Sequence, residues 1–194
     1  MSDGPDPVIL SASQTSYCEG FESQVIFSHN SQLSVRYSLL YEGTPVGSPK
    51  PGTGSVITWE NAAANGAGAY SVLARFFTDT DDSCPSMSNT VMIEALSSPD
   101  ISIFTNVTDP ICQNECIEIG FTYPGDLLLT LIYTDGTENF QILLDPNDSD
   151  DGTFTTTVCP QQTLTYALVS AWYETGPDCS FSLTHLPGVE VEVL

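Results

Sequence analysis

The chain has 194 residues, of which 41% are apolar, enough for one large hydrophobic core or two small ones. Its 25 acidic and 3 basic residues give a formal net charge of −22, which excludes nucleic acids and anionic membrane surfaces as partners, because both are bound by basic patches. The expected partner of this charge is a cation, above all Ca²⁺, which prefers carboxylate oxygens. The alternative is that the acidity only keeps the protein soluble outside the cell.

Short strands separated by turn residues run through the whole chain, and no helical period stands out. One helical turn is predicted at 62–64, because Gly66 and Gly68 stop anything longer. Seven strands in about 95 residues indicate an antiparallel β-sandwich, and the chain has room for two. The predicted strands lie near residues 8–12, 23–28, 33–41, 44–48, 54–59, 69–77 and 87–96, and then 100–105, 116–122, 127–133, 138–144, 153–158, 164–173 and 183–194.

An internal repeat divides the chain into two domains. The segment 18–27 matches 112–121, since in both an apolar residue and a Phe follow the Cys by seven and nine positions. The segment 70–77 matches 166–173, and the offset stays between 94 and 96 residues. The stiff joint at 97–99 separates the copies, so the predicted domains are 8–97 and 98–194.

Tyr70 and Tyr166 are similar to the Tyr that opens the sixth strand of an immunoglobulin-like domain, where its hydroxyl ties down a corner. Val72 and Leu168 stand where antibody domains have Cys, so the antibody-type bridge is absent. We therefore predict an all-β protein of two tandem Ig-like antiparallel β-sandwich domains. Alternation predicts the inward faces Tyr70, Val72, Ala74 and Phe76 in the first copy, and Tyr166, Leu168, Ser170 and Trp172 in the second.

Six cysteines without a C-x-x-C motif favour disulfides over a zinc site, and hence an oxidising compartment. The first residues lack the basic and apolar regions of a signal peptide, so we expect this to be a fragment of a longer secreted chain. No apolar run of about 18 residues occurs, so no membrane insertion is expected.

The order of an early Cys, a Tyr-x-Val strand, an acidic loop and a late Cys resembles the Ig-like or PKD-like repeats of large secreted surface adhesins in the Bacteroidota, including gliding-motility adhesins of the SprB type. The loops 79–84 and 174–179 carry the likeness, and the scarcity of Lys departs from it. The resemblance implies a non-enzymatic cell-surface segment that acts as a stalk, spacer or adhesive module. Its implied partners are an extracellular glycan or protein ligand and neighbouring repeats of the same chain.

The repeat makes Cys18–Cys84 and Cys112–Cys179 equivalent pairs and leaves Cys116–Cys159 as an extra bridge. In strict immunoglobulin topology, however, the first and last turns lie at opposite ends of the sandwich. The Cα atoms of a disulfide must approach within about 7 Å. Either the first strand is placed wrongly or the topology departs from the antibody type.

The loop from Asp145 to Gly152 is the most charged stretch, and it resembles the front half of a Ca²⁺ loop because oxygen-bearing residues alternate and end in Gly. The EF-hand pattern fails, since the Gly is displaced and no Glu follows at the bidentate position. A solvated loop is the alternative, whereas bound Ca²⁺ is expected to stiffen the joint between the domains. The predicted ligands are Asp145, Asn147, Asp148, Asp150 and Asp151.

Catalysis is not expected, because no G-x-S-x-G motif occurs and neither histidine has a triad context. His29 is predicted to lie in a turn and His185 to be structural. Aromatic rings can stack on sugars, and the candidates are Trp59, Phe77, Trp172 and Tyr173. Trp172 is expected to lie in the core, and Phe77 and Tyr173 either pack in an interface or are exposed, so Trp59 and Tyr173 are the predicted ligand-binding residues. A carbohydrate-binding module is therefore the second functional hypothesis.

Overall fold

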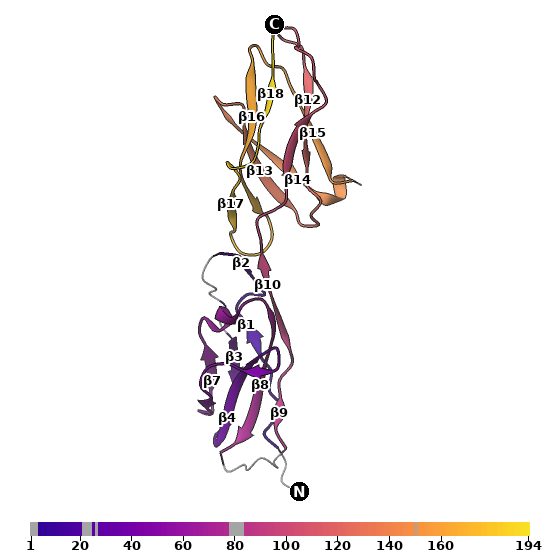
Figure 1. Cartoon of the computed structure of the whole chain (residues 1–194). Coiled ribbons are helices and arrows are strands. Elements are labelled where there is room, and N and C mark those ends of the chain that lie inside the picture. The colour runs from indigo at the N-terminus through magenta and orange to yellow at the C-terminus, as the bar shows by residue number, and fades with distance from the viewer. Residues whose placement is uncertain (1–3, 21–24, 26, 78–83, 150) are drawn as a thin grey trace. The chain divides into compact units, whose positions relative to one another are not determined.

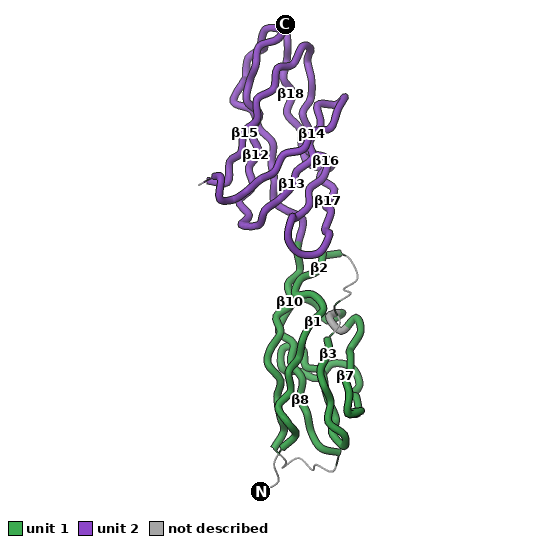
Figure 2. The backbone as a smooth tube through the Cα atoms, turned by 180° about the vertical axis from the view of Figure 1, so that it is seen from behind, with its two compact units in different colours: residues 1–96 green, residues 97–194 purple. Residues whose placement is uncertain are grey.

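The computed structural model describes residues 4–20, 25, 27–77, 84–149 and 151–194, and it consists mainly of β-strands (Figure 1). The chain divides into two compact units, Met1–Leu96 and Ser97–Leu194, shown in different colours in Figure 2. This division falls one residue before the predicted boundary. Each unit has two sheets and a hydrophobic core of its own, so each is a separate β-sandwich.

Unit 1 folds into two sheets around its core. One sheet has the order β1-β3-β7 and the other β2-β10-β8-β4-β5, in which β6 also pairs with β4 and β9 with β8. A short 3-10 helix, η1 (Ala62–Asn65), forms at the predicted helical turn. The strands are β1 (Ser11–Ala12), β2 (Ser16–Cys18), β3 (Phe27–Asn30), β4 (Val35–Tyr41), β5 (Thr44–Pro45), β6 (Lys50–Pro51), β7 (Val56–Trp59), β8 (Gly68–Phe76), β9 (Ser86–Met87) and β10 (Val91–Leu96).

Unit 2 repeats this topology. Its sheets have the orders β11-β12-β15 and β14-β13-β16-β17, and β18 pairs with β16. The 3-10 helix η2 (Pro146–Asp148) follows β14. The strands are β11 (Ser102–Thr105), β12 (Ile117–Thr122), β13 (Leu129–Thr134), β14 (Asn139–Leu144), β15 (Thr153–Val158), β16 (Leu164–Tyr173), β17 (Ser180–Ser182) and β18 (Val189–Val191).

The predicted inward face of the first copy is confirmed along β8. Tyr70, Val72 and Ala74 are fully buried, and their neighbours along the strand are less buried. Opposite them on β4, Tyr37 pairs with Ala74 and Leu39 with Val72. Alternation with period two therefore determines which side chains of this strand reach the core.

A β-bulge in unit 2 changes the inward face that alternation predicts there. The pairing of β13 with β16 skips Val169, and a skipped residue reverses the faces of those that follow. Ala171 is accordingly fully buried and Tyr173 packs against the core, whereas Trp172 is only half-buried. The prediction that Ser170 and Trp172 continue the inward face is wrong for this reason.

Tyr70 closes a corner at the start of β8. Its hydroxyl donates a hydrogen bond of 2.8 Å to the carbonyl of Gly66, four residues earlier. Burial, helped by the negative field of Tyr41, Tyr17 and Glu42, raises the pKa of Tyr70 to about 12, so the donor proton is kept at physiological pH. A hydrogen bond of this kind stabilises a fold by about 1 kcal/mol. Tyr166, the equivalent residue of unit 2, is also buried.

In unit 1 the chain enters the sandwich at one end and leaves it at the other. The backbone of Gly4 lies against Cys84, between β8 and β9; a Cβ added to Gly4 would come within 2.5 Å of the Cys84 carbonyl. The strand β10 runs antiparallel to β8, with Ile93 opposite Gly68, so Leu96 lies past the start of β8. The nine residues of β8, about 30 Å of extended chain, separate these ends. We call them the incoming and the outgoing end.

Unit 2 has the same arrangement. Ser97 lies at its incoming end, where its carbonyl accepts a hydrogen bond of 3.0 Å from the hydroxyl of Tyr173, the last residue of β16. Val191 pairs with Leu164, the first residue of β16, so Leu194 lies past it at the outgoing end. Each unit therefore carries the chain from one end of its sandwich to the other.

The first segment of unit 1 changes sheets and pairs with the last strand. Whereas β1 is antiparallel to β3 in one sheet, β2 runs parallel to β10 in the other. The Glu94 amide donates to the Thr15 carbonyl at 2.9 Å, and the Glu19 amide donates to the Leu96 carbonyl at 2.8 Å. This strand at residues 16–18 was not predicted, because three residues carry too little pattern.

Unit 2 repeats this contact as a single parallel bridge between Ile111 and Val193. The Ile111 amide donates to the Glu192 carbonyl at 3.0 Å, and the Leu194 amide donates to the Ile111 carbonyl at 2.9 Å. In both units, therefore, the segment after the first strand is hydrogen-bonded to the last segment.

His29 is a core residue and does not lie in the turn that the sequence predicted. It belongs to β3 and is 5% exposed, with its ring 4.4 Å from that of Tyr37 and 6.4 Å from that of Trp59, between centroids. Its Nε2 has no hydrogen-bond partner among the described residues. Burial lowers the pKa of His29 below its ordinary value of 6.5, because a charged ring would lose its hydration there.

This shift predicts a pH dependence for unit 1. Because the pKa of His29 is lower in the folded state, the unfolded chain takes up the proton first as the pH falls below 6.5. We expect the free energy of unfolding to be highest above that pH and to decline between pH 6.5 and 5. Urea unfolding at a series of pH values should show this decline in the wild type and its loss in His29→Phe and His29→Gln. His185→Gln, at an exposed position, should retain it. Equal pH slopes in all four proteins would contradict the assignment.

Candidate functional site

The loop predicted to bind calcium is folded by its own hydrogen bonds. Asp145 caps η2, and its Oδ1 accepts from the backbone N of Asn147 at 2.9 Å and from Nδ2 of the same residue at 2.7 Å. Asp151 Oδ1 accepts from Ser149 Oγ and from the Thr153 amide, both at 3.0 Å. These two carboxylates therefore stabilise the turns on which they lie.

The hydrogen bond from Ser149 lowers the pKa of Asp151, so this carboxylate is charged at neutral pH. Asp148 is exposed, and Asp150 lies outside the described residues. Within the part of the chain that the structure describes, no three His, Cys, Asp or Glu residues form a group that could hold a metal ion. Calcium binding at this loop stays a prediction.

Trp59 does not offer the exposed ring that sugar stacking requires. It is 6% exposed and belongs to the core of unit 1, beside His29. The alternation of β7 causes this, since Ile57 and Trp59 face inward while Val56 faces solvent. The prediction of an exposed stacking surface at Trp59 is therefore wrong.

Tyr173 already uses both its hydroxyl and its ring inside unit 2. The hydroxyl binds the Ser97 carbonyl, and the ring meets Phe181 edge to face with centroids 5.8 Å apart. Phe77 is different: it is 50% exposed, and the guanidinium carbon of Arg36 lies 5.9 Å from its ring centroid. Phe77 belongs to unit 1 and Tyr173 to unit 2, so these two rings do not form a stacking surface within one unit.

The structure contains the predicted disulfide between Cys116 and Cys159. It joins the residue before β12 to the residue after β15, next to the paired residues Ile117 and Val158. The sequence separation is 43 residues, and closing a loop of this length stabilises the fold by about 4 kcal/mol in the chain-entropy description.

The predicted pairs Cys18–Cys84 and Cys112–Cys179 are wrong. Cys84 and Cys112 are exposed free thiols, whereas Cys18 and Cys179 are disulfide-bonded. Cys18 pairs with Leu96 at the outgoing end of unit 1, and Cys84 lies at the incoming end. The length of β8 therefore keeps these two cysteines far beyond the reach of a disulfide. The topology is immunoglobulin-like, so the error lay in the predicted cysteine pairs and not in the predicted fold.

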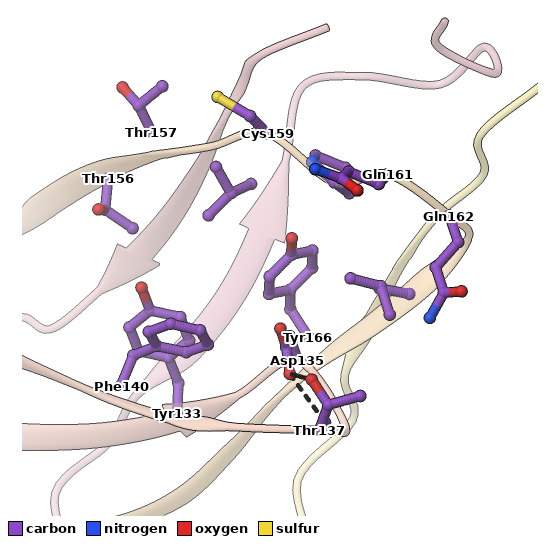
Figure 3. Close-up of a pocket in the computed structure, with 13 residues that line it drawn as sticks. Tyr133, Asp135, Thr137, Phe140, Thr156, Thr157, Cys159, Gln161, Gln162 and Tyr166 are labelled. Atoms are coloured by element: carbon purple, nitrogen blue, oxygen red, sulfur yellow. Dashed lines mark hydrogen bonds between the residues drawn. The ribbon is translucent and has the colours of Figure 1, made fainter. Parts of the chain in front are cut away.

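A hollow of about 700 Å³ opens in unit 2, between the β13–β14 turn and the segment after β15 (Figure 3). Rings, hydroxyls and side-chain amides face it, and no histidine or lysine is among the residues that line it. Tyr133 and Phe140 stack at one side with centroids 5.2 Å apart. The other polar side chains include Asp135, Thr156, Gln161, Gln162 and Tyr166.

Asp135 is the only charged group that lines this hollow, and its carboxylate is occupied. Its Oδ1 accepts from the amides of Thr137 and Glu138, each at 2.8 Å. It also accepts from Thr137 Oγ1 at 2.7 Å, and Figure 3 shows the bonding between Asp135 and Thr137. Burial acts to raise the pKa of Asp135, but the hydrogen bonds from Glu138 and Thr137 outweigh it and lower the pKa. Burial and the nearby Asp135 charge raise the pKa of Tyr166. The hollow offers hydroxyl and amide hydrogen bonds, but no nucleophile beside a base.

In the described part of the chain, no helix has the length and apolar character needed to cross a bilayer.

No protein-family model matches the chain, and no curated protein matches it. Among solved structures it is similar to a fragment of titin domains I67–I69 with a TM-score of 0.54 and 9% identity, over 99% of this chain and 66% of that one. It is also similar to a marsupial T cell receptor, with a TM-score of 0.55 and 9% identity, over 96% of this chain and 73% of that one. For a 1.5-MDa bacterial ice-binding adhesin the TM-score is 0.48 and the identity 11%, over 97% of this chain and 65% of that one.

At these identities the likeness shows the fold alone. The chain consists of two Ig-like β-sandwiches, and the predicted fold class is confirmed. The chain spans about two thirds of the titin fragment.

The calcium prediction has a direct test in thermal unfolding. Binding to the folded loop would raise the melting temperature, because a ligand of the native state stabilises it. Millimolar Ca²⁺ added to chelator-treated protein is expected to do so, and the variant with both Asp145→Asn and Asp151→Asn is expected to lose the effect. Asp109→Asn, an exposed carboxylate elsewhere in unit 2, is the control and should keep it. An unchanged melting curve in the wild type would rule out the site.

Proposed function

We propose that this chain is a non-enzymatic segment of a secreted cell-surface protein, in which tandem Ig-like domains serve as spacer or adhesive units. One observation carries the proposal: in both units the chain enters at one end of the sandwich and leaves at the other. A domain with that path separates whatever precedes it from whatever follows it. Each added copy therefore adds its own length to an array.

The parallel pairing of the first and last segments would help a unit resist mechanical tension. In unit 1 the incoming chain leads to β2 and the outgoing chain leaves β10, and these strands are parallel. Tension between the two ends of the unit slides them along each other. The hydrogen bonds of Glu94 and Glu19 are then strained together and not one after another.

The charge distribution and the disulfides support an extracellular setting. With 25 acidic residues and 3 basic ones, neighbouring copies repel one another and resist non-specific association. Arg36, Lys50 and Arg75 all belong to unit 1, so unit 2 has no Lys or Arg. Disulfides persist in oxidising compartments, which fits a secreted or surface protein.

The finer assignment, to a bacterial adhesin of the gliding-motility type, rests on the sequence resemblance of the loops 79–84 and 174–179. Its ligand would be an extracellular glycan or protein. The alternative, a carbohydrate-binding module, has less support because Trp59 is buried and Tyr173 is occupied within unit 2. The spacer function is therefore the one we favour.

Force spectroscopy tests the spacer function. With disulfides reduced, pulling through the termini should unfold two units of 96 and 98 residues. Each should release about 30 nm of chain, given at most about 3.6 Å per residue. Glu94→Pro removes the amide that donates to Thr15, so we expect it to lower one of the two unfolding forces markedly.

Glu94→Gln is the matched control, since it changes the side chain and keeps the amide; its forces should equal those of the wild type. The proposal would be contradicted if Glu94→Pro unfolded at wild-type force, or if the wild type extended without two separate steps.

A further inference from the structure

Four of the six cysteines fall into two kinds by their place in the repeat. Cys18 and Cys112 are outgoing cysteines: Cys18 pairs with Leu96, and Cys112 follows Ile111, which is hydrogen-bonded to Leu194. Cys84 and Cys179 are incoming cysteines: Cys84 is separated only by Pro85 from β9, which follows β8, and Cys179 directly precedes β17, which follows β16. The offsets between equivalent positions are 94 and 95 residues.

Each kind has one bonded and one free member. Cys18 and Cys179 are disulfide-bonded, whereas Cys112 and Cys84 are free and exposed. Since equivalent cysteines have the same place in the same topology, the fold of a unit does not itself decide whether its cysteine is bonded. The two free cysteines are one outgoing and one incoming cysteine, and each of the two kinds also has a bonded member.

The backbone holds both free thiols at the ends of their units. Cys112 opens a tight turn in which the Glu115 amide donates to its carbonyl at 2.9 Å and the Glu115 carboxylate accepts from its amide at 3.0 Å. The disulfide of Cys116 anchors the end of this turn. Cys84 is held at the incoming end of unit 1, where Gly4 lies against it. Neither thiol is therefore on a trailing terminus.

We propose that Cys112 of one copy of this chain forms a disulfide with Cys84 of a second copy, joined head to tail. The two thiols lose two protons and two electrons to glutathione disulfide, which becomes two molecules of glutathione. Unlike positions are joined, so each added copy presents a fresh Cys112 or Cys84 to which a further copy can be joined. The second copy is either a separate molecule or a following repeat in a longer chain, and the chemistry is the same.

This inference extends the spacer function but does not depend on it, because its readout is a covalent bond and not adhesion or force.

The first test mixes the variants Cys84→Ser and Cys112→Ser in equal amounts in a glutathione redox buffer. Each variant retains one of the two free thiols. A disulfide-linked dimer is therefore either like, with two Cys112 or two Cys84 residues, or unlike, with one of each. Thiols that pair at random give half unlike dimers. We expect the unlike dimer to exceed the like dimers at least tenfold. The double variant should stay monomeric with Cys116–Cys159 intact, which serves as the folding control.

Peptide mapping identifies the bond. A protease that cleaves after acidic residues is needed, because no Lys or Arg lies between Cys84 and the later cysteines. Cleavage after Asp and Glu separates Cys112 from Cys116 at Glu115. A peptide containing Cys112 linked to one containing Cys84 is the expected product. Cys112 linked to Cys116 or Cys159 would show exchange within unit 2 and would overturn the proposal.

A head-to-tail fusion of two copies distinguishes the two sources of the second copy. Its internal Cys112 and the Cys84 of the second copy share an effective concentration in the millimolar range. If a following repeat is the natural partner, this bond forms at a far lower ratio of oxidised to reduced glutathione than the bond between separate chains. If a separate molecule is the partner, the internal pair does not meet, and the fusion forms the bond only with other fusion molecules, at a ratio similar to that of the separate chains. Random pairing in the mixture, or free thiols in the oxidised fusion, would overturn the proposal.

Discussion

The parallel contact between the first and last segments of each unit is the constraint on which the rest of the structure depends. An antiparallel sandwich whose first strand stayed in one sheet would leave the last strand as an unpaired edge. Here the first segment crosses from the sheet of β3 to the sheet of β8 and covers that edge with β2, and the bridge of Ile111 does the same in unit 2. The crossing covers the edge strand and pairs the incoming segment with the outgoing one. The response of each unit to tension follows from this contact.

How far the sequence predicted the fold depends on how local the signal is. Alternation along β8 and the Tyr at its start were sufficient to place the core of unit 1, because each is a property of neighbouring residues. The same reasoning failed at Trp172, since the bulge at Val169 arises from the pairing of two distant strands. His29 was placed in a turn because its environment, the rings of Tyr37 and Trp59, comes from other strands.

The candidate sites were less predictable than the fold for a related reason. The carboxylates of the calcium loop can be counted in the sequence, but the sequence does not show that Asp145 and Asp151 accept hydrogen bonds from their own turns. The disulfides show the limit most clearly: the repeat identified which cysteines are equivalent, and equivalence within a repeat does not say that two cysteines lie at the same end. The hollow at Tyr133 and Tyr166 is lined by residues of β13, β14, β15 and β16, so no contiguous stretch of the sequence could predict it.

Native-state hydrogen exchange tests the central claim most directly. The account predicts that the Glu94 and Ile111 amides, which donate across the parallel contacts, are protected nearly as strongly as the core amides of β8 and β16. Their opening would then require unfolding of the unit. Exchange of Glu94 and Ile111 at the rate of unbonded surface amides, with β8 and β16 still protected, would contradict it, because the terminal contacts would then open without the sandwich.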